Sequence, residues 1–168
     1  FIKDIPPRSE TNLHIDQPSI YFGELSNDYV VVNTRTDEFH YPEGDNNISI
    51  RYDGTGGVRL GNLLQRLFFS LRFSSYEILV SSQLSATSRI IYHRNIADRV
   101  STIAPFFQWD EDPYLVIADG NLFWIRDGYT VTGSYPYSTP AVNGINYIRN
   151  SVKVVIDAYN GTTKFYLA

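Results

Sequence analysis

The run Asp53-Gly54-Thr55-Gly56-Gly57 is the strongest local signal for chemistry, because it leads directly into a leucine-rich segment. Free N–H groups at the start of a helix can bind an anion. The run has neither the Gly-Lys-Ser/Thr sequence of a nucleotide P-loop nor the glycine spacing of a dinucleotide-binding fingerprint. A structural turn in which glycines relieve backbone strain is the favoured interpretation. The candidate anion-binding residues are Gly54, Thr55, Gly56, Gly57 and Arg59.

Arg59 falls in the first turn of the helix that this pattern predicts. A cation there opposes the helix dipole. Arg59 therefore needs an anionic partner, which is either a bound ligand or a nearby carboxylate. The carboxylate of Asp53 is the favoured partner.

His93 lies in the one basic stretch of the sequence, which also holds Arg89, Arg94 and Arg99. Histidine titrates near neutral pH and can act as an acid or a base. No serine stands in a Gly-x-Ser-x-Gly context, and the three histidines lack metal-binding spacing. His93 is therefore a speculative acid–base residue, and no catalytic residue, metal ligand or cofactor is predicted.

The acidic cluster Asp110, Glu111 and Asp112 stands beside Trp109. Such a cluster could bind a hard cation or supply the paired carboxylates of a glycosidase. Adjacent residues point in different directions, however, and Pro113 favours a solvated turn.

Aromatic residues offer a further kind of site. The segment Tyr135-Pro136-Tyr137, with Trp109 and Trp124, could line a groove for carbohydrate or peptide. The alternative is that the rings pack against a sheet, and the exposure of the rings decides between the two.

Composition narrows the class of protein. A chain of 168 residues with 43% hydrophobic residues is sufficient for one domain with a core. The net charge of -4 argues against nucleic-acid or acidic-lipid partners. The absence of cysteine excludes disulfides and thiolate chemistry. No apolar run is long enough to span a bilayer, and the absence of an initial methionine indicates an internal portion of a longer protein.

The elements predicted from these patterns form an α+β fold of mainly antiparallel strands and hairpins with two main helices, at about 57–73 and 95–104. Asn95 is the expected cap of the second helix. Residues 1–19 form an extended lead-in, and residues 20–168 form a single domain. A hairpin is expected over 20–32, with further strands at 48–52 and 77–81.

Two hairpins can be assigned a register. Around the turn pair Asp119-Gly120, Ile117 faces Leu122, and the hairpin, apolar on both faces, is expected to sit centrally in its sheet. In the final hairpin, a two-residue type I′ turn at Asn160-Gly161 places Asp157 opposite Lys164, and it also pairs Tyr159 with Thr162, Ile156 with Phe165 and Val154 with Leu167.

Several segments, in this order along nearly the whole chain, resemble uncharacterised protein family 0182. They are Ile20-Tyr21-Phe22-Gly23-Glu24, Tyr41-Pro42, Gly54-Thr55-Gly56-Gly57-Val58, Tyr92-His93-Arg94-Asn95-Ile96 and Tyr147-Ile148-Arg149-Asn150-Ser151-Val152-Lys153.

The resemblance implies a bacterial membrane protein with several N-terminal transmembrane helices and a long extracytoplasmic region, of which this chain is one part. It implies no activity and no catalytic residues. Residues 153–166 are also similar to the closing hairpin of PepSY-type extracytoplasmic domains.

Three functional hypotheses follow. The leading one is a non-catalytic extracytoplasmic module that packs on the rest of its membrane protein or binds another envelope protein, and it requires an exposed apolar patch. The second is a sensor domain that binds a small ligand or anion at Gly54 to Arg59. The third is an envelope hydrolase that uses His93 or the acidic cluster. The residues favour a protein that is not an enzyme.

Overall fold

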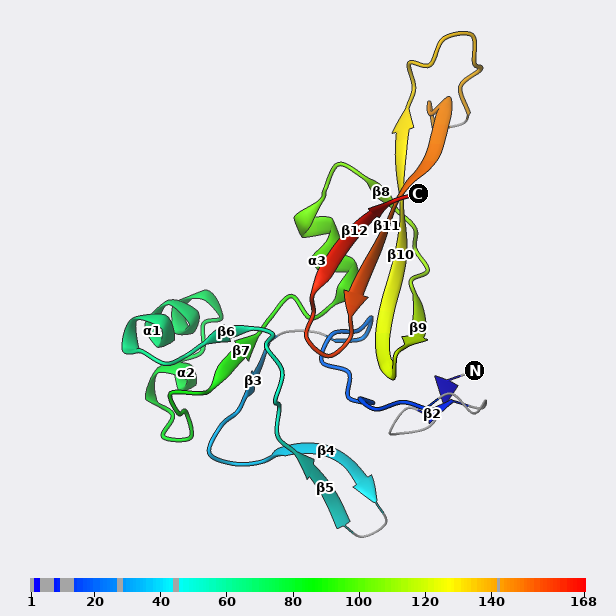
Figure 1. The fold of residues 1–168 in the computed structure, drawn as a ribbon. Helices are drawn as coiled ribbons and strands as arrows, with labels where there is room; N and C mark the ends of the chain where they lie inside the picture. Colours follow the sequence, from blue (N-terminus) through cyan, green and yellow to red (C-terminus); the bar gives the residue numbers. More distant parts are fainter. Residues whose placement is uncertain (1, 4–7, 10–13, 27–28, 44–45, 142) are drawn as a thin grey trace.

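The structure is a computed structural model that describes residues 2–3, 8–9, 14–26, 29–43, 46–141 and 143–168. All of its strand pairs are antiparallel apart from one isolated bridge, and helices occupy two regions of the chain (Figure 1). The predicted α+β class is therefore confirmed.

The C-terminal half builds a five-stranded sheet. Its central strands are β10 (Asn121–Thr132) and β11 (Tyr147–Asp157). β12 (Thr163–Leu167) pairs with the outer side of β11, while β8 (Gln108–Trp109) and β9 (Tyr114–Ala118) both pair with β10. Helix α3 (Ile96–Ile103) lies beside this sheet (Figure 1).

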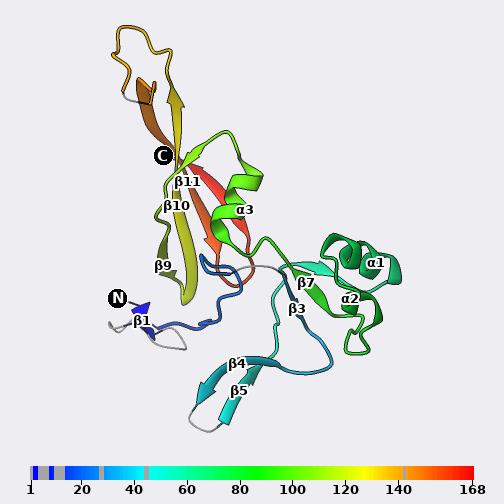
Figure 2. The ribbon, with the colours of Figure 1, turned by 180° about the vertical axis from the view of Figure 1, so that it is seen from behind.

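A second group of elements surrounds a three-stranded sheet in the order β3 (Val30–Val32), β7 (Arg89–Ile91) and β6 (Val58–Arg59). Helices α1 (Leu63–Arg72) and α2 (Glu77–Val80) lie beside it. The hairpin of β4 (Glu38–Glu43) and β5 (Asn46–Ile50) projects from this group, and the view from behind shows α1 and α2 well away from the five-stranded sheet (Figure 2).

Two clusters of buried side chains hold these groups together. The smaller cluster, which we call the second core, contains Leu60, Ile78, Leu84 and Ile90. The main core joins the two sheets, because its members come from both of them and from α3. Its buried residues are Phe22, Val32, Tyr52, Ile91, Ile96, Val100, Val154, Ile156 and Tyr159.

The predicted start of the first helix is wrong. Gly57 has φ +72°, and Val58 and Arg59 pair with β7 as a short strand. Asn62 caps the helix by accepting a hydrogen bond from the Gln65 N–H at 2.8 Å, so the helix begins at Leu63. By contrast, Asn95 caps α3 as expected, through bonds from the N–H groups of Ala97 and Asp98.

Two expected β segments also differ from the structure. Residues 20–22 do not pair with residues 29–32, because the N–H groups of Tyr21 and Phe22 both donate to the Ala158 carbonyl and β3 pairs with β7 instead. Residues 77–80 form α2 rather than a strand, with Ile78 buried in the second core. The strand expected at 48–52 corresponds to β5, which ends at Ile50.

The hairpin of β9 and β10 has the predicted register, with Ile117 opposite Leu122. Asp119 and Gly120 have φ values of 48° and 72°, as a type I′ turn requires. The expectation that the whole hairpin sits centrally is wrong, because β9 lies at an edge and only β10 is central.

The final hairpin has a different register from the predicted one, because Val155 rather than Asp157 faces Lys164. The pairs are displaced by two residues, so Ile156 faces Thr163, Val154 faces Phe165 and Leu167 lies opposite Val152. The Asp157 carboxylate accepts hydrogen bonds from the N–H groups of Tyr159 and Asn160, and only Gly161 of the turn has a positive φ. These bonds produce a four-residue loop, Ala158 to Gly161, in which Tyr159 no longer faces Thr162.

The lead-in contributes only two short strands, β1 (Ile2–Lys3) and β2 (Arg8–Ser9), which pair with each other. The rest of residues 1–13 lies outside the described residues. The predicted boundary at residue 20, between the lead-in and the domain, stays a prediction.

A pair of glycine substitutions tests how tightly the final turn is packed. A Cβ at Gly161 would overlap the Phe22 ring, whereas a Cβ at Gly144, which has a similar φ of 79°, would meet nothing within 4 Å. Gly144→Ala should therefore cost about 1 kcal/mol from backbone strain alone. Gly161→Ala should cost about 2–4 kcal/mol, because overpacking adds to the strain. Urea unfolding measures both, and equal costs would contradict the packing described.

Candidate functional site

The glycine run does not lie at a helix start. Residues 54–57 form a loop before β6, and two of its N–H groups are bound by the protein itself. The Thr55 N–H donates to Asn160 Oδ1 at 2.8 Å, and the Gly56 N–H donates to the Tyr52 hydroxyl at 2.8 Å. The helix start that motivated the anion-site prediction is therefore absent.

The same loop turns three carbonyl groups toward Arg89. The guanidinium donates to the oxygens of Thr55 at 2.5 Å, Gly56 at 2.6 Å and Gly57 at 3.0 Å. The loop thus binds a cationic side chain, which is the opposite polarity to an anion site. Sequence reasoning placed Arg89 only in a basic stretch and missed this contact, because the two segments meet only through the pairing of β6 with β7.

Arg59 is an exposed residue of β6, and it lies opposite Arg89 of β7. Among the residues that the structure describes, Arg59 forms no ion pair with Asp53, so the expected carboxylate partner is wrong. Asp53 instead accepts a hydrogen bond from the Tyr159 hydroxyl at 2.5 Å.

Three tyrosines pack together where the loop meets the final turn. The rings of Tyr21, Tyr52 and Tyr159 have centroids 4.7–5.4 Å apart. Burial is the main cause that raises the pKa of each phenol, and hydrogen bonds to Glu38 and Asp53 raise the pKa of Tyr21 and Tyr159 further. These hydroxyls stay protonated at neutral pH and join segments far apart in the chain.

His93 lies between β7 and α3 with φ +49°. Its Nε2 is 3.4 Å from an Arg72 nitrogen, and its carbonyl accepts a hydrogen bond from Arg99 at 3.3 Å. The structure thus places a guanidinium, rather than a carboxylate or a hydroxyl, beside the ring. Among the described residues, the His93 ring forms no hydrogen bond to a carboxylate or hydroxyl that would orient it for acid–base work.

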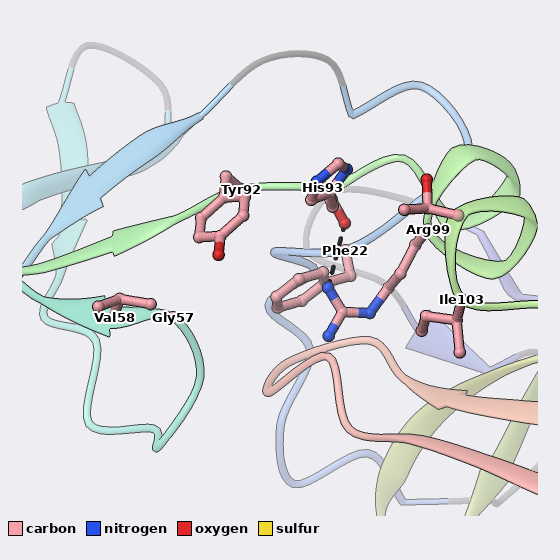
Figure 3. Close-up of a pocket in the computed structure, with 8 residues that line it drawn as sticks. Phe22, Gly57, Val58, Tyr92, His93, Arg99 and Ile103 are labelled. Carbon is pink, nitrogen blue, oxygen red and sulfur yellow. Dashed lines mark hydrogen bonds between the residues drawn. The ribbon is translucent and has the colours of Figure 1, made fainter. Parts of the chain in front are cut away.

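A cleft of about 320 Å³ lies between β6 and α3 (Figure 3). It brings together two of the candidate residues, Gly57 and His93, whereas Gly54, Thr55, Gly56 and Arg59 do not line it. Sequence reasoning missed its most polar member, Arg99. The lining residues are Phe22, Gly57, Val58, Tyr92, His93, Arg99, Thr102 and Ile103.

The acidic cluster forms a turn rather than a site. Asp110 accepts hydrogen bonds from the Asp112 N–H at 3.1 Å and from the Tyr129 hydroxyl at 2.9 Å, and these two bonds lower the pKa of Asp110. Within the described ranges, no group of three or more His, Asp or Glu side chains is arranged to hold a metal ion.

The aromatic residues that could line a groove are divided between two places. Trp109 and Trp124 pack against the main core, and their indole N–H groups donate to backbone carbonyls. Tyr135 stacks on Tyr147 with ring centroids 4.7 Å apart, and Tyr137 is fully exposed in the loop beyond β10. The tryptophans are thus structural, and only the tyrosines of the loop are exposed.

A stripe of apolar side chains along α1 faces outward. Leu67 is 38% exposed, and the other members of the stripe are 66–70% exposed. The opposite side of the helix packs on the second core through Phe69 and Phe73. The helix therefore has two apolar faces, of which only one is used. We call the exposed side the leucine face; its residues are Leu63, Leu64, Leu67, Phe68 and Leu71.

Comparison with known proteins identifies relatives along the whole chain. The model of "Uncharacterised protein family (UPF0182)" matches residues 1–168. A UPF0182 protein of Pelotomaculum thermopropionicum is 50% identical over 168 residues, which cover 100% of this chain and 18% of that protein. A UPF0182 protein of Geobacter sulfurreducens is 52% identical over 169 residues, which cover 100% of this chain and 19% of that protein.

The chain thus spans about a fifth of the length of the curated relatives it matches. No solved structure matches it. In the described part of the chain, no helix has the length and apolar character that crossing a membrane requires.

The acidic turn gives a prediction for low pH. Because the folded state lowers the pKa of Asp110, its contribution to stability is present above the unfolded-state pKa of about 4 and is lost as the pH falls through the folded-state pKa. Tyr129→Phe removes one of the hydrogen bonds and should raise the pKa of Asp110. A carboxyl NMR titration measures this rise, and an unchanged pKa would contradict it. Tyr76→Phe, at an exposed position, is the control.

Proposed function

Because this chain belongs to the uncharacterised protein family UPF0182, we propose that it is a non-catalytic module that docks on the remainder of its own protein through the leucine face of α1. The single observation that carries this proposal is the outward direction of that face. Monomeric soluble proteins rarely expose contiguous apolar patches of this kind, and such patches mark interaction surfaces.

The energy available from the leucine face is sufficient for stable docking. Full burial of one large apolar side chain stabilises by about 1.5–3 kcal/mol. Leu63, Leu64, Phe68 and Leu71 are each about two thirds exposed, so covering the face contributes several kcal/mol in total. The helix already folds against the second core through Phe69 and Phe73, so little ordering cost is added on docking.

The length of the relatives supports an intramolecular partner. About four fifths of each relative lies outside the matched region. A surface on the same polypeptide is present at a high effective concentration, so an apolar contact of modest area is sufficient to hold it. Another envelope protein or a second copy would have to find the face by diffusion.

The non-catalytic part of the proposal rests on the partners of the polar groups. Asp110 is bound within its own turn, and the His93 ring lies beside Arg72. The location on the extracytoplasmic side of a bacterial cell membrane is part of the same proposal. It rests on the architecture that the family resemblance implies.

Hydrogen exchange in the full-length protein tests the docking. The backbone N–H groups of residues 63–72 should exchange more slowly in the full-length protein than in the isolated 168-residue chain. The double substitution Leu64→Glu with Phe68→Glu should abolish this difference, because two carboxylates would have to be buried. The isolated chain should change little in stability, since both positions are exposed.

Ile148→Glu is the matched control, because Ile148 is an exposed apolar residue on β11, in the other group of elements. Equal exchange in the full-length protein and the isolated chain would contradict the proposal. Concentration-dependent dimerisation of the isolated chain through α1 would replace it with a second copy, and binding of α1 to lipid vesicles would replace it with a membrane surface.

A cysteine label tests the location. The chain has no cysteine of its own, and Tyr137 is fully exposed. In the full-length protein, Tyr137→Cys should react with a membrane-impermeant maleimide while the cytoplasmic membrane is intact, at a rate similar to that after lysis. A cytoplasmic protein with an exposed cysteine must stay unlabelled in the same cells. Labelling of Tyr137→Cys only after lysis would place this chain in the cytoplasm.

A further inference from the structure

Arg99 has an unusual set of partners for a half-buried cation. Its guanidinium donates to Thr163 Oγ1 at 3.0 Å, to the Gly161 carbonyl at 2.7 Å and to the His93 carbonyl at 3.3 Å. All three acceptors are neutral. In the described part of the chain, no carboxylate forms an ion pair with Arg99, although buried charges are normally paired.

The geometry leaves part of the guanidinium available. A guanidinium has five N–H donors, and three of them make the bonds to Thr163, Gly161 and His93. One N–H on each terminal nitrogen therefore has no partner among the described residues. The Phe22 ring lies 4.9 Å from the guanidinium carbon on one side. The ring holds the plane of the guanidinium fixed.

This guanidinium lines the cleft between β6 and α3 (Figure 3). Val58 on one wall and Ile103 on the other are apolar, while Tyr92 and Thr102 carry hydroxyl groups. A second opening on the other side of His93 is lined by Arg72 and Arg94. Asp98 also lines this second opening. Across the two openings, three arginines therefore outnumber one carboxylate, although the chain as a whole has a net charge of -4.

We propose that this cleft binds a small organic carboxylate, with the carboxylate on Arg99 and the apolar body between Val58 and Ile103. The two terminal N–H groups of a guanidinium match the two oxygens of a carboxylate, which is the strongest common form of charge-assisted hydrogen bond. The cleft volume of about 320 Å³ is at the small end of ligand sites. It suits a ligand of few carbon atoms rather than a nucleotide.

This inference goes beyond docking and does not depend on it, because the leucine face of α1 does not line the cleft. The competing explanation is that Arg99 is only a structural link, which ties the final turn to the His93 carbonyl between β7 and α3. A structural link requires no ligand, so the two explanations differ in whether a charged probe binds.

Three probes separate these explanations on the 168-residue chain. Benzoate has a charge and an apolar body, acetate has the charge alone, and benzamide has the body alone. Benzoate should bind at least about tenfold more tightly than either of the other two, because each lacks one of the contacts that the cleft provides. Titration followed by NMR should shift the N–H signals of Gly57, Thr102 and Ile103.

A substitution that preserves Arg99 locates the binding, because Arg99 variants could fail to fold. Ile103→Trp fills the mouth of the cleft from a position that is 51% exposed, and it should weaken benzoate binding at least about tenfold. Ser101→Trp on the same helix is the control, since Ser101 is exposed and does not line the cleft. Equal binding of benzoate and benzamide, no benzoate binding, or benzoate binding unaffected by Ile103→Trp would each overturn the proposal.

Discussion

The fold depends on the turn between β11 and β12, because several segments that are distant in the sequence bind to it. The Asp157 carboxylate fixes the turn by accepting the N–H groups of Tyr159 and Asn160. The turn then offers the Ala158 carbonyl to residues 21 and 22, and the Asn160 side chain to the glycine loop. Gly161 lies against Phe22, where no Cβ would fit. Without this turn, the N–H groups of Tyr21, Phe22 and Thr55 would lose these acceptors.

Arginines join further segments that lie apart in the sequence. Arg89 binds the glycine loop, Arg94 binds the Tyr21 carbonyl, and Arg126 binds the carbonyls of Ala97 and Asp110. A guanidinium can donate several hydrogen bonds at once, so one side chain can hold backbone from two or three segments. In a chain without cysteine, these hydrogen bonds hold segments together without any disulfide.

Two features among the described residues keep no partner of matching chemistry within the chain and are the basis of the two proposals. One is apolar, the leucine face of α1, and the other is charged, the guanidinium of Arg99 in its cleft. Both lie on ordered elements rather than in loops. The first is suited to a large apolar surface and the second to a small anion, so they call for different partners and are separable by experiment.

Features set by neighbouring residues were predictable from the sequence, and those set by distant ones were not. The Asn95 cap, the register around Asp119 and Gly120, and the α+β class depend on contacts within a few residues, and all three are confirmed. The register of the final hairpin failed because Asp157 side-chain bonds override the preference of Asn-Gly for a two-residue turn. The leucine-rich character of this segment is visible in the sequence, but the direction in which its leucines face is not. That direction was decided by the tertiary structure, because Phe69 and Phe73 on the opposite side of the helix pack against the second core and leave the leucines in solvent.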